Sequence, residues 1–385
     1  MTQLPRGFGC YVTNVGIKDD SDDFVVVAAK ATCVADGVFT KSRFAGPSVQ
    51  VSREHLAGGR ARAIVIVSKN ANVATGPVGL ANARELASGV AERIGCESAD
   101  VVVASTGVIG RPYPMDRVRA GIAAIPIELP SCTADDAARG IMTTDTVAKV
   151  AEATIGTSGA RVVGIAKGVG MIEPDMATLI TAMFTDAEIE QPVLSASFRR
   201  VIDRTFNCVS VDTDTSTSDT AVVLASGVAG VVDVAEFETA LHDVALSLTK
   251  QIARDGEGAE KLIEVHVDGA RDTAQAKRVA KAIVNSPLVK TAVHGADPNW
   301  GRVAMAIGKC SDDTDIDQER VVIRFGDTEV YPRQLDDAGL AALSDYMSGT
   351  TVLIHVSLAT GDADATVWGC DLTAGYVRIN ADYTT

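Results

Sequence analysis

Short runs of apolar residues recur along this chain of 385 residues. Most cover four to six residues, which matches the length of a buried strand and falls short of a typical helix. The runs are rich in Val, Ala, Ile and Leu, residues that suit a core of strands and helices. We predict strands at residues 24–29, 63–67, 101–104, 162–166, 179–184, 209–211, 221–225 and 263–267.

Longer segments with helical spacing of apolar residues lie between these runs. In residues 235–255, Phe237, Leu241 and Leu248 fall on one helical face. Residues 142–146 are expected to interrupt or cap the helix predicted around them. The alternation of strands and helices predicts an α/β fold. Helices are predicted at residues 80–94, 115–124, 133–153, 192–204, 235–255 and 274–284.

The pattern changes near residue 286. A dense turn is predicted at residues 294–302, and one helix is predicted at 332–347. We therefore divide the chain into a main α/β domain, 1–285, and a smaller α+β C-terminal region, 286–385. Strands of this second region are predicted at 321–325, 352–356, 366–370 and 376–379.

The formal net charge of −15 excludes some classes of partner. An acidic surface repels a phosphate backbone and an anionic membrane, so we expect neither nucleic acid nor a membrane as partner. No run has the length of a membrane-spanning helix, and residues 1–20 lack the apolar core of a signal peptide. The sequence therefore predicts a cytoplasmic protein.

The seven cysteines and five histidines are widely scattered. Neither a Cys-x-x-Cys nor a His-Glu-x-x-His occurs, so we expect reduced, mostly buried thiols and no metal site. His266 and His355 lie in alternating strand patterns and are interpreted as structural. Residues 212–220 are rich in Asp, Thr and Ser, which suits either a solvated loop or a cation site.

A glycine-rich loop at residues 167–178 runs directly into the strand predicted at 179–184. On composition alone, an ordinary turn before a core strand explains it. A second interpretation is that the bond between Ala177 and Thr178 breaks, which would give Thr178 a free α-amino group with a pKa near 8. That amine can accept the threonine hydroxyl proton and make the oxygen nucleophilic. The chemistry needs oxyanion donors, which a strand-end turn at Thr106 and Gly107 could supply.

The loop also resembles a known motif. It reads Lys-Gly-x-Gly-Met-Ile-x-Pro-x-Met-Ala-Thr over residues 167–178 and closely resembles the self-cleavage motif of the ornithine acetyltransferase family, also called glutamate N-acetyltransferases. Other signatures, such as Gly-x-Ser-x-Gly or a phosphate-binding glycine loop, are absent from the sequence. Further blocks similar to the family occur in family order at residues 105–110, 142–146, 255–258, 285–292, 297–302 and 376–385.

The resemblance implies a fold and an activity. The fold is an α/β/β/α sandwich with two central sheets between helical layers, plus the smaller C-terminal region. The activity is transfer of the acetyl group of N-acetyl-L-ornithine to L-glutamate through an acetyl-threonine, without cofactor or metal. Two enzymatic alternatives stay open, a bifunctional form that also uses acetyl-CoA and a related self-cleaving aminopeptidase. A third alternative, a non-catalytic binding protein with the same fold, is disfavoured by intact Thr178, Thr106 and Gly107.

The resemblance also assigns roles to residues. Thr178 matches the nucleophile that first cleaves the chain after Ala177, and Thr106 with Gly107 matches the oxyanion hole. The products would be an α chain, 1–177, and a β chain, 178–385, assembled as a heterotetramer or larger. The C-terminal tail would have to return to the active site. The positions that match the amino-acid-binding residues are Thr144, Lys167, Thr178, Glu257, Asn380 and Thr385.

One departure from the family pattern lies beside the scission site. The family commonly has His-Pro-Asn where this chain has Glu173, Pro174 and Asp175. The two acids make the chain similar to a variant associated with clavulanic acid clusters, so both arginine biosynthesis and antibiotic biosynthesis are candidate pathways. We also expect these acids to change the rate or pH dependence of cleavage.

Overall fold

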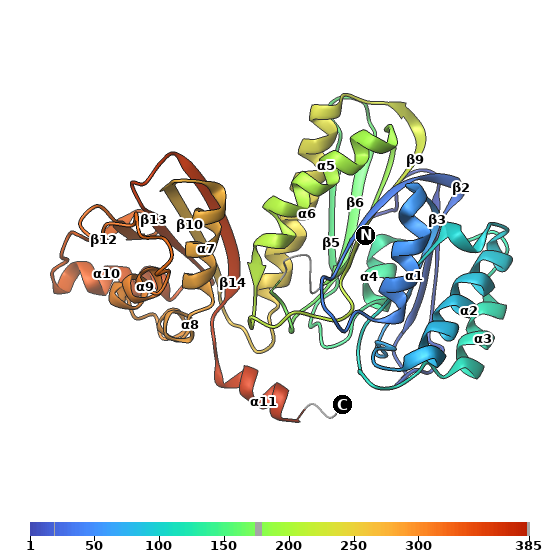
Figure 1. Cartoon of the computed structure of the whole chain (residues 1–385), viewed down its shortest axis with the longest axis horizontal. Helices are drawn as coiled ribbons and strands as arrows, with labels where there is room; N and C mark the ends of the chain where they lie inside the picture. The colour runs from blue at the N-terminus through green and yellow to red at the C-terminus, as the bar shows by residue number, and fades with distance from the viewer. Residues whose placement is uncertain (19, 174–178, 383–385) are drawn as a thin grey trace.

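The computed structural model describes residues 1–18, 20–173 and 179–382. Its strands form two sheets with helices packed on them (Figure 1). The larger sheet has eight strands in the order β4-β3-β2-β9-β7-β6-β5, and β1 pairs with β2 beside that path. These strands are β1 (Phe8–Thr13), β2 (Phe24–Phe39), β3 (Arg60–Val67), β4 (Val101–Ser105), β5 (Lys149–Thr154), β6 (Arg161–Lys167), β7 (Ile180–Glu188) and β9 (Thr220–Val231).

The long strand β2 joins two halves of this sheet. Its first half lies between β1 and β3, and its second half pairs with β9. Side chains alternate along a strand, so Val25 and Val27 face a core shared with Phe184 of the other half, while Phe24 and Val26 face the opposite side. Phe8 packs on Phe184 with ring centroids 5.2 Å apart. The two halves therefore pack face to face.

Helices cover both outer faces of this pair. The α2 helix contributes Leu86 and Val90 to the core behind β3 and β4, and α6 contributes Leu241 and Leu248 to the core behind β7 and β9. The predicted α/β/β/α sandwich is thus confirmed. The helices of this part are α1 (Pro47–His55), α2 (Gly76–Ile94), α3 (Met115–Ala124), α4 (Ala134–Gly140), α5 (Gln191–Arg204) and α6 (Val234–Arg254).

The smaller sheet has six strands in the order β12-β11-β13-β10-β14-β8. The sequence interpretation put the C-terminal region at 286–385, whereas this sheet also contains β8 and β10, and the helix after β10 packs on it. Its strands are β8 (Val209–Ser210), β10 (Leu262–Ala270), β11 (Val322–Phe325), β12 (Thr328–Tyr331), β13 (Thr351–Ser357) and β14 (Ala363–Cys370). The later helices are α7 (Thr273–Val284), α8 (Pro287–His294), α9 (Trp300–Gly308), α10 (Asp337–Met347) and α11 (Ala374–Asp382).

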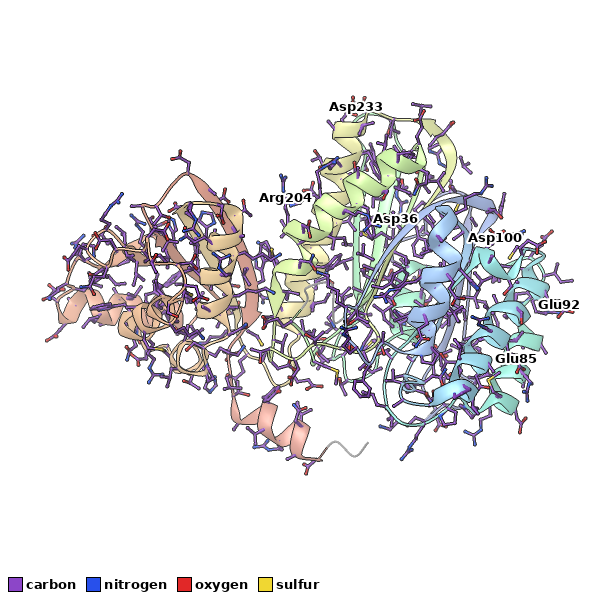
Figure 2. All side chains as sticks on the ribbon, in the orientation of Figure 1. Asp36, Glu85, Glu92, Asp100, Arg204 and Asp233 are labelled. Carbon is purple, nitrogen blue, oxygen red and sulfur yellow. A yellow bond between two sulfur atoms is a disulfide. The ribbon has the colours of Figure 1, made fainter. Side chains whose placement is uncertain are left out.

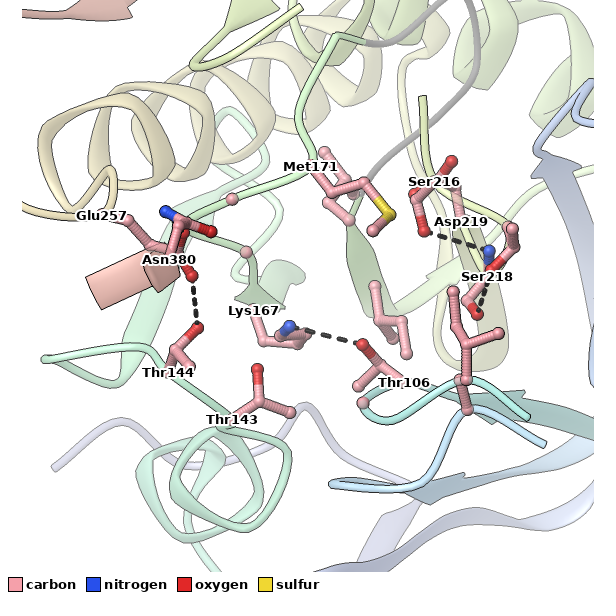
Figure 3. A pocket seen from close by; sticks show the side chains of 18 residues that line it. Thr106, Thr143, Thr144, Lys167, Met171, Ser216, Ser218, Asp219, Glu257 and Asn380 are labelled. Carbon is pink, nitrogen blue, oxygen red and sulfur yellow. Dashed lines mark hydrogen bonds between the residues drawn. The ribbon is translucent and has the colours of Figure 1, made fainter. Parts of the chain in front are cut away.

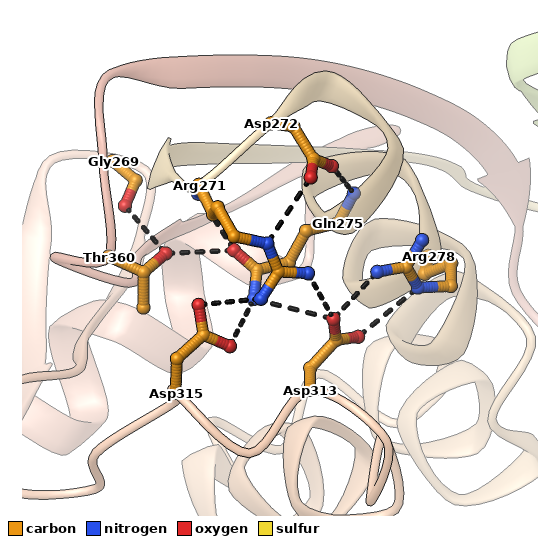
Figure 4. Close-up of polar contacts among 8 residues, drawn as sticks. All are labelled: Gly269, Arg271, Asp272, Gln275, Arg278, Asp313, Asp315 and Thr360. Carbon is orange, nitrogen blue, oxygen red and sulfur yellow. Dashed lines mark hydrogen bonds and ion pairs between the residues drawn. The ribbon is translucent and has the colours of Figure 1, made fainter.

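Polar side chains fix the ends of several elements. Asp233 accepts hydrogen bonds from the first backbone amides of α6, and Arg204 lies in the last turn of α5, each favourable for the helix dipole (Figure 2). In the second sheet, Asp313 accepts hydrogen bonds from both Arg271 and Arg278 and so holds the loop after α9 against α7 (Figure 4). These contacts make the connections part of the packed structure.

Three predicted elements are wrong. The helix predicted at 133–153 ends at Gly140, and Lys149–Thr154 pairs with β6 as a strand. The capping box of Thr133 and Asp136 starts the helix, but nothing in the local sequence reveals the pairing. The strand predicted at 376–379 lies inside helix α11, and the turn predicted at 294–302 contains the start of α9. Helices α1 and α8 and strands β1 and β12 were not predicted.

The cysteine prediction also needs correction. Cys10 and Cys132 form a disulfide with Cα atoms 5.6 Å apart, whereas Cys33, Cys208 and Cys370 are buried free thiols. The pairing joins β1 to the segment before α4, which are distant in sequence and adjacent in the fold. Within the described residues, none of the helices is long and apolar enough to span a membrane.

Candidate active site

A cavity of about 170 Å³ lies where both ends of the glycine-rich loop that follows β6 meet the sandwich and the C-terminal helix (Figure 3). Segments far apart in sequence line it: the turn after β4, the loop after α4, the end of β6, the start of β7 and the turn after α6. Six residues with predicted site roles line this cavity: Thr106, Gly107, Thr144, Lys167, Glu257 and Asn380.

Lys167 is the cation of the cavity. It is the last residue of β6, and its Nζ lies 3.4 Å from Thr106 Oγ1 and 3.9 Å from Asp145 Oδ2. Burial lowers the pKa of Lys167, and the negative charge of Asp145 opposes that shift. A desolvated ammonium of this kind is well suited to bind a substrate carboxylate.

A buried cluster of charges lies behind Lys167. Asp145 Oδ1 accepts hydrogen bonds from Lys149 Nζ and from the Gly168 N–H, both at 2.7 Å. Lys149 is completely buried and also contacts Asp255 at 2.5 Å. Burial alone would raise the pKa of Asp145, but Lys167, Lys149 and the hydrogen bonds together bring it to about 2. The carboxylate therefore stays ionised and fixes the turn that follows Lys167.

The turn at Thr106 and Gly107 faces the cavity from the end of β4. The Thr106 N–H donates to Val67 O at 3.1 Å, so only the Thr106 hydroxyl is available to a ligand. Gly107 has φ +129°, and a Cβ there would lie 2.2 Å from the carbonyl carbon of Lys69. Only glycine fits that conformation and that approach. Its N–H has no acceptor among the described residues, which leaves it open to an oxyanion.

Glu257 faces the cavity from the turn after α6. Its carboxylate accepts hydrogen bonds from Thr144 Oγ1 at 3.1 Å and from Asn380 Nδ2 at 2.9 Å. A Cβ on Gly170 would lie 2.6 Å from this carboxylate, so the glycine lets Glu257 approach the loop. Asn380 belongs to α11, and its contact brings the C-terminal helix to the cavity.

Asp219 was missed by the sequence interpretation. It lies just before β9, lines the cavity and is 4% exposed. Burial raises its pKa well above the usual range for a carboxyl group. Its Oδ2 has no hydrogen-bond partner among the described residues. Of residues 212–220, interpreted as a solvated loop or a cation site, residues 216–219 thus line the cavity (Figure 3).

The predicted nucleophile lies outside the described residues, as do Ala177 and Thr385. The flanking residues are placed. Lys167 and Ile180 are partners in the antiparallel pair of β6 and β7, so the loop between them starts and ends at neighbouring points. The groups of histidine and carboxylate side chains that could hold a metal lie elsewhere among the described residues and not in this cavity.

The loop is held firmly on its N-terminal side. The carboxylate of Asp212 accepts hydrogen bonds from the amides of Met171 and Ile172 at 2.6 and 2.7 Å. Glu173 Oε2 accepts from Asn285 Nδ2 at 2.6 Å, and Lys281 Nζ lies 3.7 Å from Glu173 Oε1. The acid that departs from the family pattern therefore connects the loop to α7.

A comparison with known proteins agrees with these features. The model of the ArgJ family matches residues 10–385. The chain belongs to the ArgJ family. It is 58% identical to "Arginine biosynthesis bifunctional protein ArgJ 2" of Nostoc sp., over 100% of this chain and 99% of that protein. It is 59% identical to "Glutamate N-acetyltransferase Oat2" of Streptomyces clavuligerus, over 100% and 98%. The predicted family is confirmed.

A solved structure supports the fold. The ArgJ protein of Bacillus halodurans is 41% identical and aligns with a TM-score of 0.50, covering 54% of this chain and all of that chain. As an ArgJ-family member the chain is an acetyltransferase, and the cavity holds a cation and a carboxylate as an amino-acid site requires. Lys149 and Asp219 were not found from the sequence, because Lys149 meets Asp255 only in the fold and Asp219 becomes buried only there.

Proposed function

We propose that this chain is a self-cleaving glutamate N-acetyltransferase that moves the acetyl group of N-acetyl-L-ornithine to L-glutamate. The observation that carries the proposal is identity of 58–59% over full length to proteins named for arginine biosynthesis and for glutamate N-acetylation. The cavity supports it, because Lys167 and Glu257 offer opposite charges to an amino acid. A carboxylate would pair with Lys167 and an amine with Glu257.

Cleavage comes first in this scheme. The hydroxyl of Thr178 attacks the carbonyl carbon of Ala177, and the peptide nitrogen leaves as the free amine of Thr178. The resulting ester between Ala177 and Thr178 is then hydrolysed by water. The Thr106 hydroxyl and the Gly107 N–H are the proposed donors to the oxyanion. The products are an α chain, 1–177, and a β chain, 178–385.

Acetyl transfer then uses the same hydroxyl. The Thr178 amine takes the hydroxyl proton, and the oxygen attacks the acetyl carbonyl of N-acetyl-L-ornithine. The proton passes to the leaving nitrogen, so ornithine departs and an acetyl-threonine remains. The amine of glutamate attacks this ester and gives N-acetyl-L-glutamate. The kinetics are expected to be ping-pong, and the scheme uses no cofactor or metal.

An alternative proposal is that a different compound donates the acetyl group in the first half-reaction. Acetyl-CoA would acetylate Thr178 in place of N-acetyl-L-ornithine. The observation that favours this alternative is the word "bifunctional" in the names of several relatives. Incubation with each donor alone, followed by the mass of the β fragment, separates the two possibilities.

The biological setting is also part of the proposal. We infer a role in arginine biosynthesis, in line with the relatives' names, and the similarity to the Streptomyces clavuligerus protein supports a clavulanic acid pathway as the alternative. The α and β chains would stay together and assemble as a heterotetramer or larger in the cytoplasm. The tail residue Thr385 would complete the amino-acid site beside Thr144 and Asn380.

Intact-mass analysis of purified protein tests the mechanism. Wild type should give two fragments divided between Ala177 and Thr178, and Thr178→Ala should give one full-length mass because it has no nucleophile. Thr154→Ala, at the exposed end of β5, is the matched control and should cleave like wild type. Adding N-acetyl-L-ornithine should increase the mass of the β fragment by one acetyl group. An uncut wild type with full transferase activity would refute the mechanism.

A further inference from the structure

Three metal-binding side chains lie together on the smaller sheet, away from the cavity. Strands β10 and β13 are parallel neighbours in the smaller sheet (Figure 1). His266 is the direct partner of His355 in their register. Asp268 lies two residues after His266 and therefore points from the same face. One ligand atom from each of the three lies within 4.8 Å of the other two. We propose that His266, Asp268 and His355 bind one divalent transition-metal ion, with Zn²⁺ as the preferred occupant.

The orientation of each side chain suits this role. His266 Nδ1 lies 3.0 Å from Thr366 Oγ1, a contact that leaves Nε2 of the same ring for a metal. His355 Nε2 lies 2.9 Å from Asp268 Oδ2, so these two ligand atoms already face each other. Zn²⁺ with nitrogen and oxygen ligands at about 2.0 Å places them roughly 3.3 Å apart in a tetrahedron. Small side-chain rotations would reach that geometry.

The surroundings limit the site to three protein ligands. Glu264 lies two residues before His266 on the same face, but its Oε2 is contacted by Trp368 Nε1 at 2.9 Å and Lys250 Nζ at 3.0 Å. It does not belong to the group of ligand atoms formed by His266, Asp268 and His355. The side chains of His355 and Asp268 are 25% and 39% exposed. The ion would therefore take two imidazoles, one carboxylate and a water from the open side.

The alternative is a simple ion pair between His355 and Asp268 with no ion bound. Two imidazoles on adjacent strands, with ring centroids 5.1 Å apart, favour the metal. A single histidine and carboxylate would suffice for the pair, whereas two imidazoles and a carboxylate match the ligands that Zn²⁺ prefers. Bound metal would join β10 to β13 and stabilise this sheet. The site is independent of the proposed acetyl transfer, because none of its ligands lines the cavity.

Titration of zinc into metal-free protein tests this proposal. After dialysis against a chelator, calorimetry with ZnCl₂ should show one ion per chain with a micromolar or lower Kd. His355→Gln should weaken binding about a hundredfold, because the amide keeps a hydrogen bond to Asp268 but replaces an imidazole ligand. Co²⁺ should give the visible absorption of a tetrahedral site, and Asp268→Asn should change that spectrum.

The control addresses the second group of candidate ligands. His294 lies near Glu260 and Asp371 on another part of the chain, and His294→Gln should bind Zn²⁺ like wild type. Equal melting temperatures for metal-free wild type and His355→Gln would show that the substitution does not unfold the sheet. Absence of binding at millimolar Zn²⁺, unchanged binding by His355→Gln, or loss of binding in His294→Gln would each overturn the proposal.

Discussion

Asp145 is the residue on which the buried charges of the active site depend. Its carboxylate contacts Lys149, which is fully buried, and also holds the Gly168 amide. We expect Asp145→Asn to lower the free energy of unfolding by about 3 kcal/mol, because one buried ammonium would lose half of its negative partners. Urea denaturation at neutral pH measures the change. Asp116→Asn, whose side chain is fully exposed, should change it by less than about 0.5 kcal/mol.

The same carboxylate predicts a pH dependence. The pKa of Asp145 is about 2 in the folded protein and about 4 in an unfolded chain. A carboxyl group whose pKa is lowered by folding stabilises the protein fully above its unfolded pKa and loses that contribution as the pH falls through the folded value. The difference in unfolding free energy between wild type and Asp145→Asn should therefore narrow from pH 4 to pH 2. A difference that stays constant over this range would contradict the assigned pKa.

The sequence identified several residues that line the cavity, but it did not identify the buried charged residues around them. Thr106, Lys167 and Glu257 were named through the resemblance to the ornithine acetyltransferase family, and all three line one cavity. Their roles in binding and catalysis stay predictions. Asp219 and Lys149 carry no motif, since a buried carboxyl or ammonium becomes recognisable only when strands from distant segments surround it. Local sequence does not contain that information.

Among the elements, strongly periodic segments were predicted well and pairing-dependent ones were not. Helix α6 follows from its apolar face, and its observed bounds differ from the prediction by one residue at each end. Strand β5 was predicted as helix because its alternation is weak and its partner β6 decides its conformation. Helix α11 buries none of its side chains, so it lacks the apolar face that identifies a helix from sequence.

The first part of the glycine-rich loop, residues 168–173, gives a prediction at the element scale. Glu173 joins this part of the loop to α7 through Asn285 and to β8 through Ser210 Oγ at 3.2 Å. Glu173→Ala should slow self-cleavage roughly tenfold, because a small displacement of reacting groups is costly to rate. The appearance of the two fragments after synthesis in a cell-free system, followed on a denaturing gel, measures this rate.

Glu173→Gln is the matched variant for this test. Its amide oxygen still accepts a hydrogen bond from Asn285, and only the charge facing Lys281 is lost. Cleavage of Glu173→Gln within about threefold of wild type would indicate that anchoring matters more than charge, since the Lys281 ammonium lies 3.7 Å away and makes no close contact with the carboxylate. Equal rates for Glu173→Ala and wild type would show that the anchor has no part in cleavage.

At the scale of the whole molecule, the proposed cut would divide the strands of the large sheet between two chains. Strands β7 and β9 would belong to the β chain, and they lie between β2 and β6 of the α chain. Their ladders, β2 with β9 and β6 with β7, remain complete on both sides of the cut. Both chains also contribute to the cores between the sheet halves and behind β7. Separation would require breaking two ladders and exposing both cores.

We therefore expect the two fragments to remain associated and to unfold together. Cleaved wild type and uncut Thr178→Ala should elute together in size-exclusion chromatography, and the fragments should separate only in denaturant. Because the two fragments share strand ladders and hydrophobic cores, the cleaved form should unfold thermally in one transition that includes both fragments. Hydrogen exchange should show similar protection of the backbone amides in β6 and β7. Fragments that separate in native buffer would contradict this arrangement of strands, whatever the activity of the mixture.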